Sequence, residues 1–176
     1  MSDETLTAGG IRTADTVPLR LAVLRPGCPA DAAVFDGDDD PHTFHAGVRL
    51  GGRVVGVASV YLQGRGPGAP GGAPPVPAAH DGTCWQLRGM ATQDGLRGRG
   101  VGRLALRACL AHVASRGGTW AWCNARTGAV GFYAAQGWRV VSPEFDIPTV
   151  GPHVVMETPV APAASGGGPL GRTPRP

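Results

Sequence analysis

The sequence predicts one domain of the α/β (α+β) class, with a mixed, mostly antiparallel central sheet and flanking helices. Two apolar runs flank Gly51-Gly52, a dipeptide suited to a tight hairpin turn. A strand, a glycine-rich loop and an alanine- and leucine-rich helix follow one another between Met90 and Arg116. A further apolar run begins directly after Gly117-Gly118, which is typical of a helix end. With 176 residues and 42% apolar content, the chain fits a single hydrophobic core.

The elements are predicted in the order β-hairpin, then β-α-β-α-β-β, with one short strand before the hairpin. That first strand is Leu19–Leu24, which stops at Arg25-Pro26-Gly27. The first predicted helix places Arg103 and Arg107 four residues apart on one face, with apolar residues on another face. The second predicted helix is closed by Gly137. We expect the remaining strands at residues 44–50, 53–62, 83–92, 119–124, 138–141 and 153–158, and the helices at 100–115 and 127–136.

The ordered domain is expected to span residues 11–158. Within it, residues 64–82 consist mostly of Gly, Pro and Ala and are expected to form a flexible loop. Residues 159–176 include a Ser-Gly-Gly-Gly-Pro stretch and are expected to be a disordered tail, because such a composition buries too little apolar surface to offset the cost of ordering.

The charge distribution predicts one basic and one acidic face. Seven arginines and no acids occur between residues 95 and 143, whereas residues 31–40 hold five acids. The net charge is only +3, and the arginines cluster around glycines instead of spreading with aromatics along a groove. A small polyanion therefore fits better than nucleic acid as the partner of the basic face.

The cysteines and the hydropathy predict a cytoplasmic protein. The four cysteines are isolated, without C-x-x-C spacing, and are expected to be reduced and mostly buried. No apolar run approaches the roughly 18 residues that a membrane span needs, so no membrane partner is expected.

The segment from Arg97 to Arg103 predicts an anion-binding cradle. Its glycines leave backbone N–H groups uncovered at the start of a helix, where the helix dipole adds positive potential. A nucleoside triphosphatase loop is excluded because the chain has no lysine. A dinucleotide fold matches the G-x-G-x-x-[GA] pattern from Gly100 to Ala105, but the acid it needs about 20 residues further on is missing.

Two motifs resemble the GNAT acyltransferase family. The stretch from Met90 to Gly102 resembles its acetyl-coenzyme A motif, a strand followed by [QR]-x-x-G-x-[GA], here Arg97, Gly100 and Gly102. Residues 129–138 resemble the A-x-x-F-Y-x-x-x-G-[FY] segment and follow a strand that ends in Asn124-Ala125-Arg126. The chain departs from the family between Pro26 and His42, where two helices are usual. That region often shapes the acceptor pocket.

The resemblance implies a GNAT-like strand-loop-helix cradle for acetyl-coenzyme A as co-substrate, with no metal. The amides of residues 98–103 would bind the pyrophosphate, and backbone groups of Met90 and Thr92 would pair with the pantetheine arm. A backbone N–H near Ala91 or Thr92 would stabilise the oxyanion. The implied cofactor-binding residues are Met90, Ala91, Thr92, Arg97, Gly98, Arg99, Gly100, Val101, Gly102, Arg103 and Asn124.

The same resemblance implies catalytic groups in the second half of the chain. Tyr133 occupies the position of a tyrosine general acid, although a packed aromatic without a proton role fits too. Glu144 is the first choice for the base, followed by Asp146 and His153, and each of the three could equally be a structural or solvated group.

The implied function is N-acetyl transfer from acetyl-coenzyme A to a primary amine of a small molecule or peptide by direct attack. The alternative is a coenzyme A-binding sensor without turnover. Dimers through sheet edges are common in the family, so a homodimer is possible. His42 and His45 are expected to line the acceptor pocket and not to bind metal. Arg88 is expected either to recognise an acceptor carboxylate or to pair with an acid such as Asp36 or Asp38.

Overall fold

The computed structural model describes residues 5–63 and 83–163. The loop predicted at residues 64–82 lies outside the described residues, as do residues 164–176 of the predicted tail. The helices are α1 (Thr13–Leu24), α2 (Val101–Ser115) and α3 (Val130–Ala134), with the short 3-10 helices η1 (Ala30–Ala33) and η2 (Thr127–Ala129). The strands are β1 (Thr7–Gly10), β2 (Phe44–Leu50), β3 (Arg53–Leu62), β4 (Cys84–Thr92), β5 (Trp120–Arg126), β6 (Arg139–Val140), β7 (Phe145–Ile147) and β8 (Gly151–Pro159).

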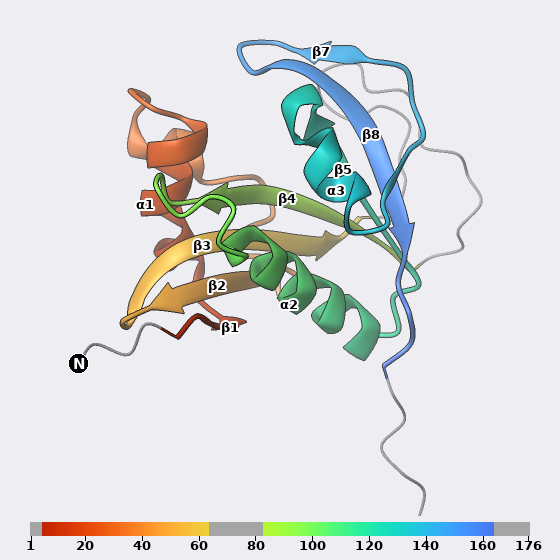
Figure 1. Ribbon diagram of the computed structural model, residues 1–176, viewed down its shortest axis with the longest axis horizontal. Helices are drawn as coiled ribbons and strands as arrows, with labels where there is room; N and C mark the ends of the chain where they lie inside the picture. Colours follow the sequence, from red (N-terminus) through yellow and green to blue (C-terminus); the bar gives the residue numbers. More distant parts are fainter. Residues whose placement is uncertain (1–4, 64–82, 164–176) are drawn as a thin grey trace, which may run out of the picture.

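The strands form one sheet in the order β1-β2-β3-β4-β5-β8-β6, and β7 also pairs with β8 (Figure 1). Every neighbouring pair is antiparallel except β4 and β5, which run parallel. Helices α1 and α2 both pack on the sheet. This mixed, mostly antiparallel sheet with flanking helices confirms the predicted fold class.

Helices α1 and α2 cover opposite faces of the sheet. Gly56 of β3 lies directly under Val101 of α2, whereas Ser59 bonds Arg20 of α1. Residues an odd number apart on a strand point to opposite faces, so the two helices enclose β3 between them. Helix α2 buries one stripe, at i, i+4, i+5, i+8 and i+12, as an amphipathic helix does. The stripe is Val101, Ala105, Leu106, Cys109 and Val113.

The strand predicted at Leu19–Leu24 is wrong, because these residues form the C-terminal half of α1. The Asp15 carboxylate accepts a hydrogen bond from the Arg12 N–H and so caps the helix start. Thr16 and Arg20, four residues apart, are fully buried, which is the spacing of a helix face. The short apolar run after Pro18 is compatible with a strand or with a helix. Its packing against the sheet favours the helix.

The other predicted elements are found within a few residues of their expected bounds. The hairpin of β2 and β3 is confirmed, and both residues of its turn have positive φ (55° at Gly51 and 78° at Gly52). Strands β1 and β7 were not predicted. Strand β1 precedes the expected domain start at Ile11, and beyond the expected end Val160 is still buried. Cys84, Cys109 and Cys123 are buried, as expected, and Cys28 is exposed.

Candidate active site

The predicted cradle forms between β4 and α2. Gly95, Gly98 and Gly100 all have positive φ, between 79° and 85°, a conformation that glycine adopts without strain. Within the described part of the chain, no backbone carbonyl accepts from the N–H groups of Gly98 or Gly100–Arg103. These amides stand at the positive end of a 15-residue helix, beside the exposed side chains of Arg97, Arg99 and Arg103. The arrangement suits a diphosphate.

The sheet opens beside this cradle. Strands β4 and β5 pair between Cys84–Gln86 and Trp120–Trp122, so among the described residues the later half of β4 has no partner strand on its β5 side. The Gln93 N–H donates to Val55 O of β3 at 2.9 Å. Successive amides of a strand point to alternate sides, so Met90 and Thr92 direct their N–H groups into the opening, and Ala91 directs its N–H toward β3.

A β-bulge in β4 includes Met90. Ser59 of β3 pairs with Arg88, whereas Val57 pairs with Ala91, so β4 holds one extra residue between the two pairs. Gly89 takes positive φ (61°) at this bulge. The bulge therefore sets the direction of the Met90 amide.

A cavity of about 520 Å³ lies along the opening. Five of the predicted cofactor residues line it: Met90, Ala91, Thr92, Arg97 and Gly102. Gly98, Arg99, Gly100, Val101 and Arg103 are not part of its wall and lie in the cradle. Asn124 lines a second, larger cavity instead.

Tyr133 lines both cavities and is buried. Its hydroxyl lies 3.4 Å from Met90 Sδ. Burial, followed by the neighbouring Cys123 thiol, raises the pKa of Tyr133 well above its ordinary value. The hydroxyl therefore keeps its proton at neutral pH, as a proton donor must.

The larger cavity, of about 890 Å³, is walled by segments far apart in the sequence. Its ionisable lining consists of Arg25, Asp36, Asp40, Tyr61, Arg88, Arg126, Tyr133 and His153. Sequence analysis missed Tyr61, Gln86 and Arg126 as lining residues, and no local pattern marks them. Asn124 Oδ1 is buried and has no hydrogen-bond partner among the described residues. It offers an acceptor to a donor entering this cavity.

The three base candidates differ in placement. Glu144 and Asp146 are exposed and line neither cavity, so the structure does not bring them to the site. His153 is buried and lines the larger cavity. Its Nδ1 lies 2.7 Å from Gly151 O, and a carbonyl only accepts, so Nδ1 carries the hydrogen. Nε2 is then left with a free lone pair.

Arg88 pairs with an acid, which is the second of the two alternatives predicted for it. Its guanidinium bonds the Asp38 carboxylate at 3.2 Å and the carbonyl oxygen of Asp36, and stacks on Tyr61 with its Cζ 4.0 Å from the ring centroid. Contrary to expectation, neither His42 nor His45 lines either of these two cavities. His45 is instead bonded inside the protein. Among the described residues, no group of three His, Cys, Asp or Glu side chains could hold a metal.

Comparison with known proteins decides the family. A sequence model of the Acetyltransferase (GNAT) family matches residues 18–138. This chain belongs to the GNAT family. It is an acetyltransferase, and the cradle between β4 and α2 lies within the matched residues.

Relatives of this GNAT enzyme agree with that assignment. The uncharacterized N-acetyltransferase YitI of Bacillus subtilis (strain 168) is 32% identical over 146 residues, 83% of this chain and 91% of YitI. A candidate N-acetyltransferase from Lactobacillus plantarum has the same fold, with a TM-score of 0.68, 22% identity and coverage of 89% and 99% of the two chains. An aminoglycoside 6'-N-acetyltransferase complexed with coenzyme A matches with a TM-score of 0.62, 13% identity and coverage of 90% and 99%. In the described ranges, no helix of this GNAT enzyme is long and apolar enough to cross a membrane.

Proposed function

We propose that this acetyltransferase takes acetyl-coenzyme A as its acetyl donor and transfers the acetyl group to a primary amine of a small molecule or peptide. The observation that carries the proposal is the meeting of two cavities at Met90 and Tyr133, which line both. One cavity adjoins the anion cradle, and the other is lined by polar side chains, among them Asn124, whose Oδ1 has no partner among the described residues. A donor and an acceptor can therefore meet beside the bulge of β4.

Backbone groups bind the donor. The amides of Gly98 and Gly100–Arg103 hold the diphosphate, and Arg97 and Arg99 add charge-assisted contacts. The free edge of β4 at Thr92 pairs with the amide groups of the pantetheine arm as an added strand does. The Met90 N–H then stabilises the oxyanion that forms on the thioester carbonyl.

His153 acts as the base and replaces Glu144, because it alone of the base candidates reaches a cavity. Its Nε2 takes a proton from the incoming ammonium, and Asn124 Oδ1 accepts a hydrogen bond from the amine. The neutral nitrogen then forms its bond to the carbonyl carbon.

Tyr133 completes the transfer. As the carbon–sulfur bond breaks, its hydroxyl gives a proton to the departing thiolate. The proton that the new amide nitrogen loses restores the Tyr133 hydroxyl, and His153 releases its proton to solvent. No covalent enzyme intermediate is needed.

Coenzyme A release across a panel of amines, with acetyl-coenzyme A binding measured by calorimetry, tests the proposal. The double variant Arg97→Glu/Gly100→Glu should weaken binding by about 100-fold or more, since losing about two charge-assisted hydrogen bonds costs at least about 3 kcal/mol. Arg107→Glu, an exposed charge reversal on the same helix, is the matched control and should bind normally. Unchanged binding in the double variant would contradict the cradle. Binding of acetyl-coenzyme A by the wild type without release of coenzyme A on any amine would support the sensor alternative.

The cytoplasmic location and the homodimer stay predictions.

A further inference from the structure

A buried ion pair lies directly behind the bulge of β4. Arg20 of α1 is fully buried, and Asp38, in the loop between η1 and β2, is 3% exposed. The Asp38 carboxylate accepts from both terminal nitrogens of Arg20, from the Phe35 N–H at 2.9 Å and from Arg88 at 3.2 Å. Burial acts to raise the pKa of Asp38, but the hydrogen bonds and charges of these donors outweigh it, and the pKa is lowered. The carboxylate is therefore ionised at neutral pH.

This pair holds the residues on both sides of the bulge. Arg20 donates to Ser59 Oγ at 2.8 Å, and Ser59 is the β3 partner of Arg88. Asp38 bonds Arg88, which directly precedes Gly89. The last register pair before the bulge is thus tied to the ion pair from both strands.

The Arg20 guanidinium also lies directly beside Gly89 of the bulge. A Cβ on Gly89 would stand 2.7 Å from Arg20 Nε and 3.0 Å from Phe35 Cε2, so a side chain has no room there. The Arg20 Cζ lies 4.4 Å from the centroid of the Phe35 ring, which completes the packing behind Gly89. Gly89 is therefore enclosed on this side of the sheet.

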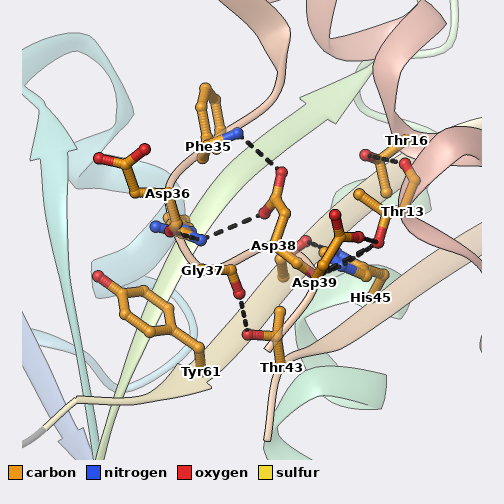
Figure 2. Close-up of polar contacts among 12 residues, drawn as sticks. Thr13, Thr16, Phe35, Asp36, Gly37, Asp38, Asp39, Thr43, His45 and Tyr61 are labelled. Carbon is orange, nitrogen blue, oxygen red and sulfur yellow. Dashed lines mark hydrogen bonds and ion pairs between the residues drawn. The ribbon is translucent and has the colours of Figure 1, made fainter. Parts of the chain in front are cut away.

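A second set of bonds holds the Asp38 backbone. Because Ser59 Oγ already accepts from Arg20, its hydrogen is free to go to His45 Nδ1, which lies 2.6 Å away. His45 Nε2 then carries a hydrogen and donates to Asp38 O at 2.9 Å. The loop that carries Asp38 is thereby tied to β2 and β3 as well as to α1 (Figure 2).

Stability alone does not account for this arrangement. Replacing a buried ion pair by apolar residues of similar volume is often neutral or stabilising. Arg20 Nε is in addition buried without a partner in the described part of the chain, which costs free energy. The pair instead fixes the position of the bulge, since it contacts Ser59, Arg88 and Gly89.

We propose that Arg20 and Asp38 are positioning residues for acetyl transfer: they hold the Gly89 bulge so that the Met90 N–H stays aimed at the thioester carbonyl. The inference rests on the proposed function, because it assigns the oxyanion contact to Met90. Neither side chain touches a substrate. Their effect reaches the reaction through two neighbours of the bulge, Ser59 and Arg88, and through contact with Gly89.

The test is the double variant Arg20→Met/Asp38→Leu, which removes both charges and avoids leaving one of them buried alone. At a temperature well below the melting point, kcat should fall by about 10- to 100-fold, since a shift of about 1 Å at a reacting group costs up to about 100-fold. KM for acetyl-coenzyme A should stay within about threefold, because an oxyanion contact acts in the transition state. The matched control, Arg139→Met/Glu157→Leu, removes the ion pair between β6 and β8 and should leave kcat unchanged.

Amide hydrogen exchange separates this inference from the proposed function. In the Arg20/Asp38 double variant, exchange at Gly89–Ala91 should speed up, and in the control it should not. If the wild type transfers acetyl to no amine, the proposed function fails, and the exchange result alone decides whether the pair holds the bulge. A double variant with unchanged kcat, or with unchanged exchange at these amides, would overturn the inference. So would an equal loss of kcat in the control.

Discussion

Replacing His153 by Asn separates the roles of its two ring nitrogens, because the variant can keep the hydrogen bond of Nδ1 but loses Nε2. The Asn Nδ2 amide lies where Nδ1 does, so it can keep the 2.7 Å hydrogen bond to Gly151 O. The Nε2 atom is lost, and with it the lone pair that the proposed base uses. General base catalysis contributes about 10²- to 10⁴-fold, so kcat/KM should fall by that factor, or about 3–5 kcal/mol of transition-state stabilisation.

Steady-state kinetics with two classes of acceptor measure the effect. For an ordinary alkyl amine, which arrives protonated, the full loss is expected. For a weakly basic amine that is already neutral at the assay pH, the loss should shrink, because the enzyme no longer has to remove that proton before attack. This dependence on the acceptor distinguishes a base from a residue that only shapes the cavity.

His112→Asn is the matched control. His112 stacks on Phe44, with ring centroids 4.3 Å apart, and lines neither cavity, so this variant should melt lower and keep its kcat. Loss of a general base should lower kcat/KM by at least about 100-fold. If kcat/KM of His153→Asn stays within about threefold of the wild-type value, His153 is not the base.

Two further predictions concern stability. A Cβ on Gly56 would stand 2.3 Å from Val101 Cγ1, so Gly56→Ala should lower the free energy of unfolding by about 1–3 kcal/mol and the melting temperature by several degrees. The double variant Gly56→Ala/Val101→Ala should lose less stability than the two single variants together, because the smaller side chain removes the clash. Simple additivity of the two losses would count against the clash. The pKa of Asp38 is lowered, so the folded state binds the proton of this carboxyl group more weakly than the unfolded state does. The ionised carboxylate therefore stabilises the fold at pH values above its unfolded pKa of about 3.9. This contribution is lost as the pH falls through the folded pKa. Melting temperatures measured across acidic pH should therefore fall more steeply for the wild type than for Arg20→Met/Asp38→Leu, and parallel curves would contradict the assignment.

The donor side of the site was predictable because its signals are local. The turn of the hairpin and the cradle both need glycines in conformations that other residues avoid, and they stand at the predicted positions, as Gly51 and Gly100 illustrate. The helix that follows the cradle buries a regular apolar stripe. These features depend on residues within one or two turns of each other, so a single sequence is enough to find them.

Glu144 does not lie at either cavity, because proximity along the chain does not determine exposure. Glu144 follows β6 closely, but the pairing of β7 with β8 leaves its side chain in solvent. The position of His153 comes from the register of β5 and β8, which sets it opposite Arg126. Register between distant strands has no signature in the short motifs from which the site was predicted.

The acidic segment shows the same limit more sharply. Asp36, Asp38, Asp39 and Asp40 are near neighbours of one residue type, and their sequence suits either a group that binds a cationic acceptor or a plain solvated turn. The structure gives them different tasks, because Asp38 alone is buried, against a guanidinium carried by α1. Helix α1 is also the element that sequence analysis mistook for a strand, so the partner that distinguishes Asp38 could not be identified from the sequence. Local patterns thus located the anion cradle, whereas the geometry behind the reacting amide depends on a contact between an arginine and an aspartate 18 residues apart in the chain.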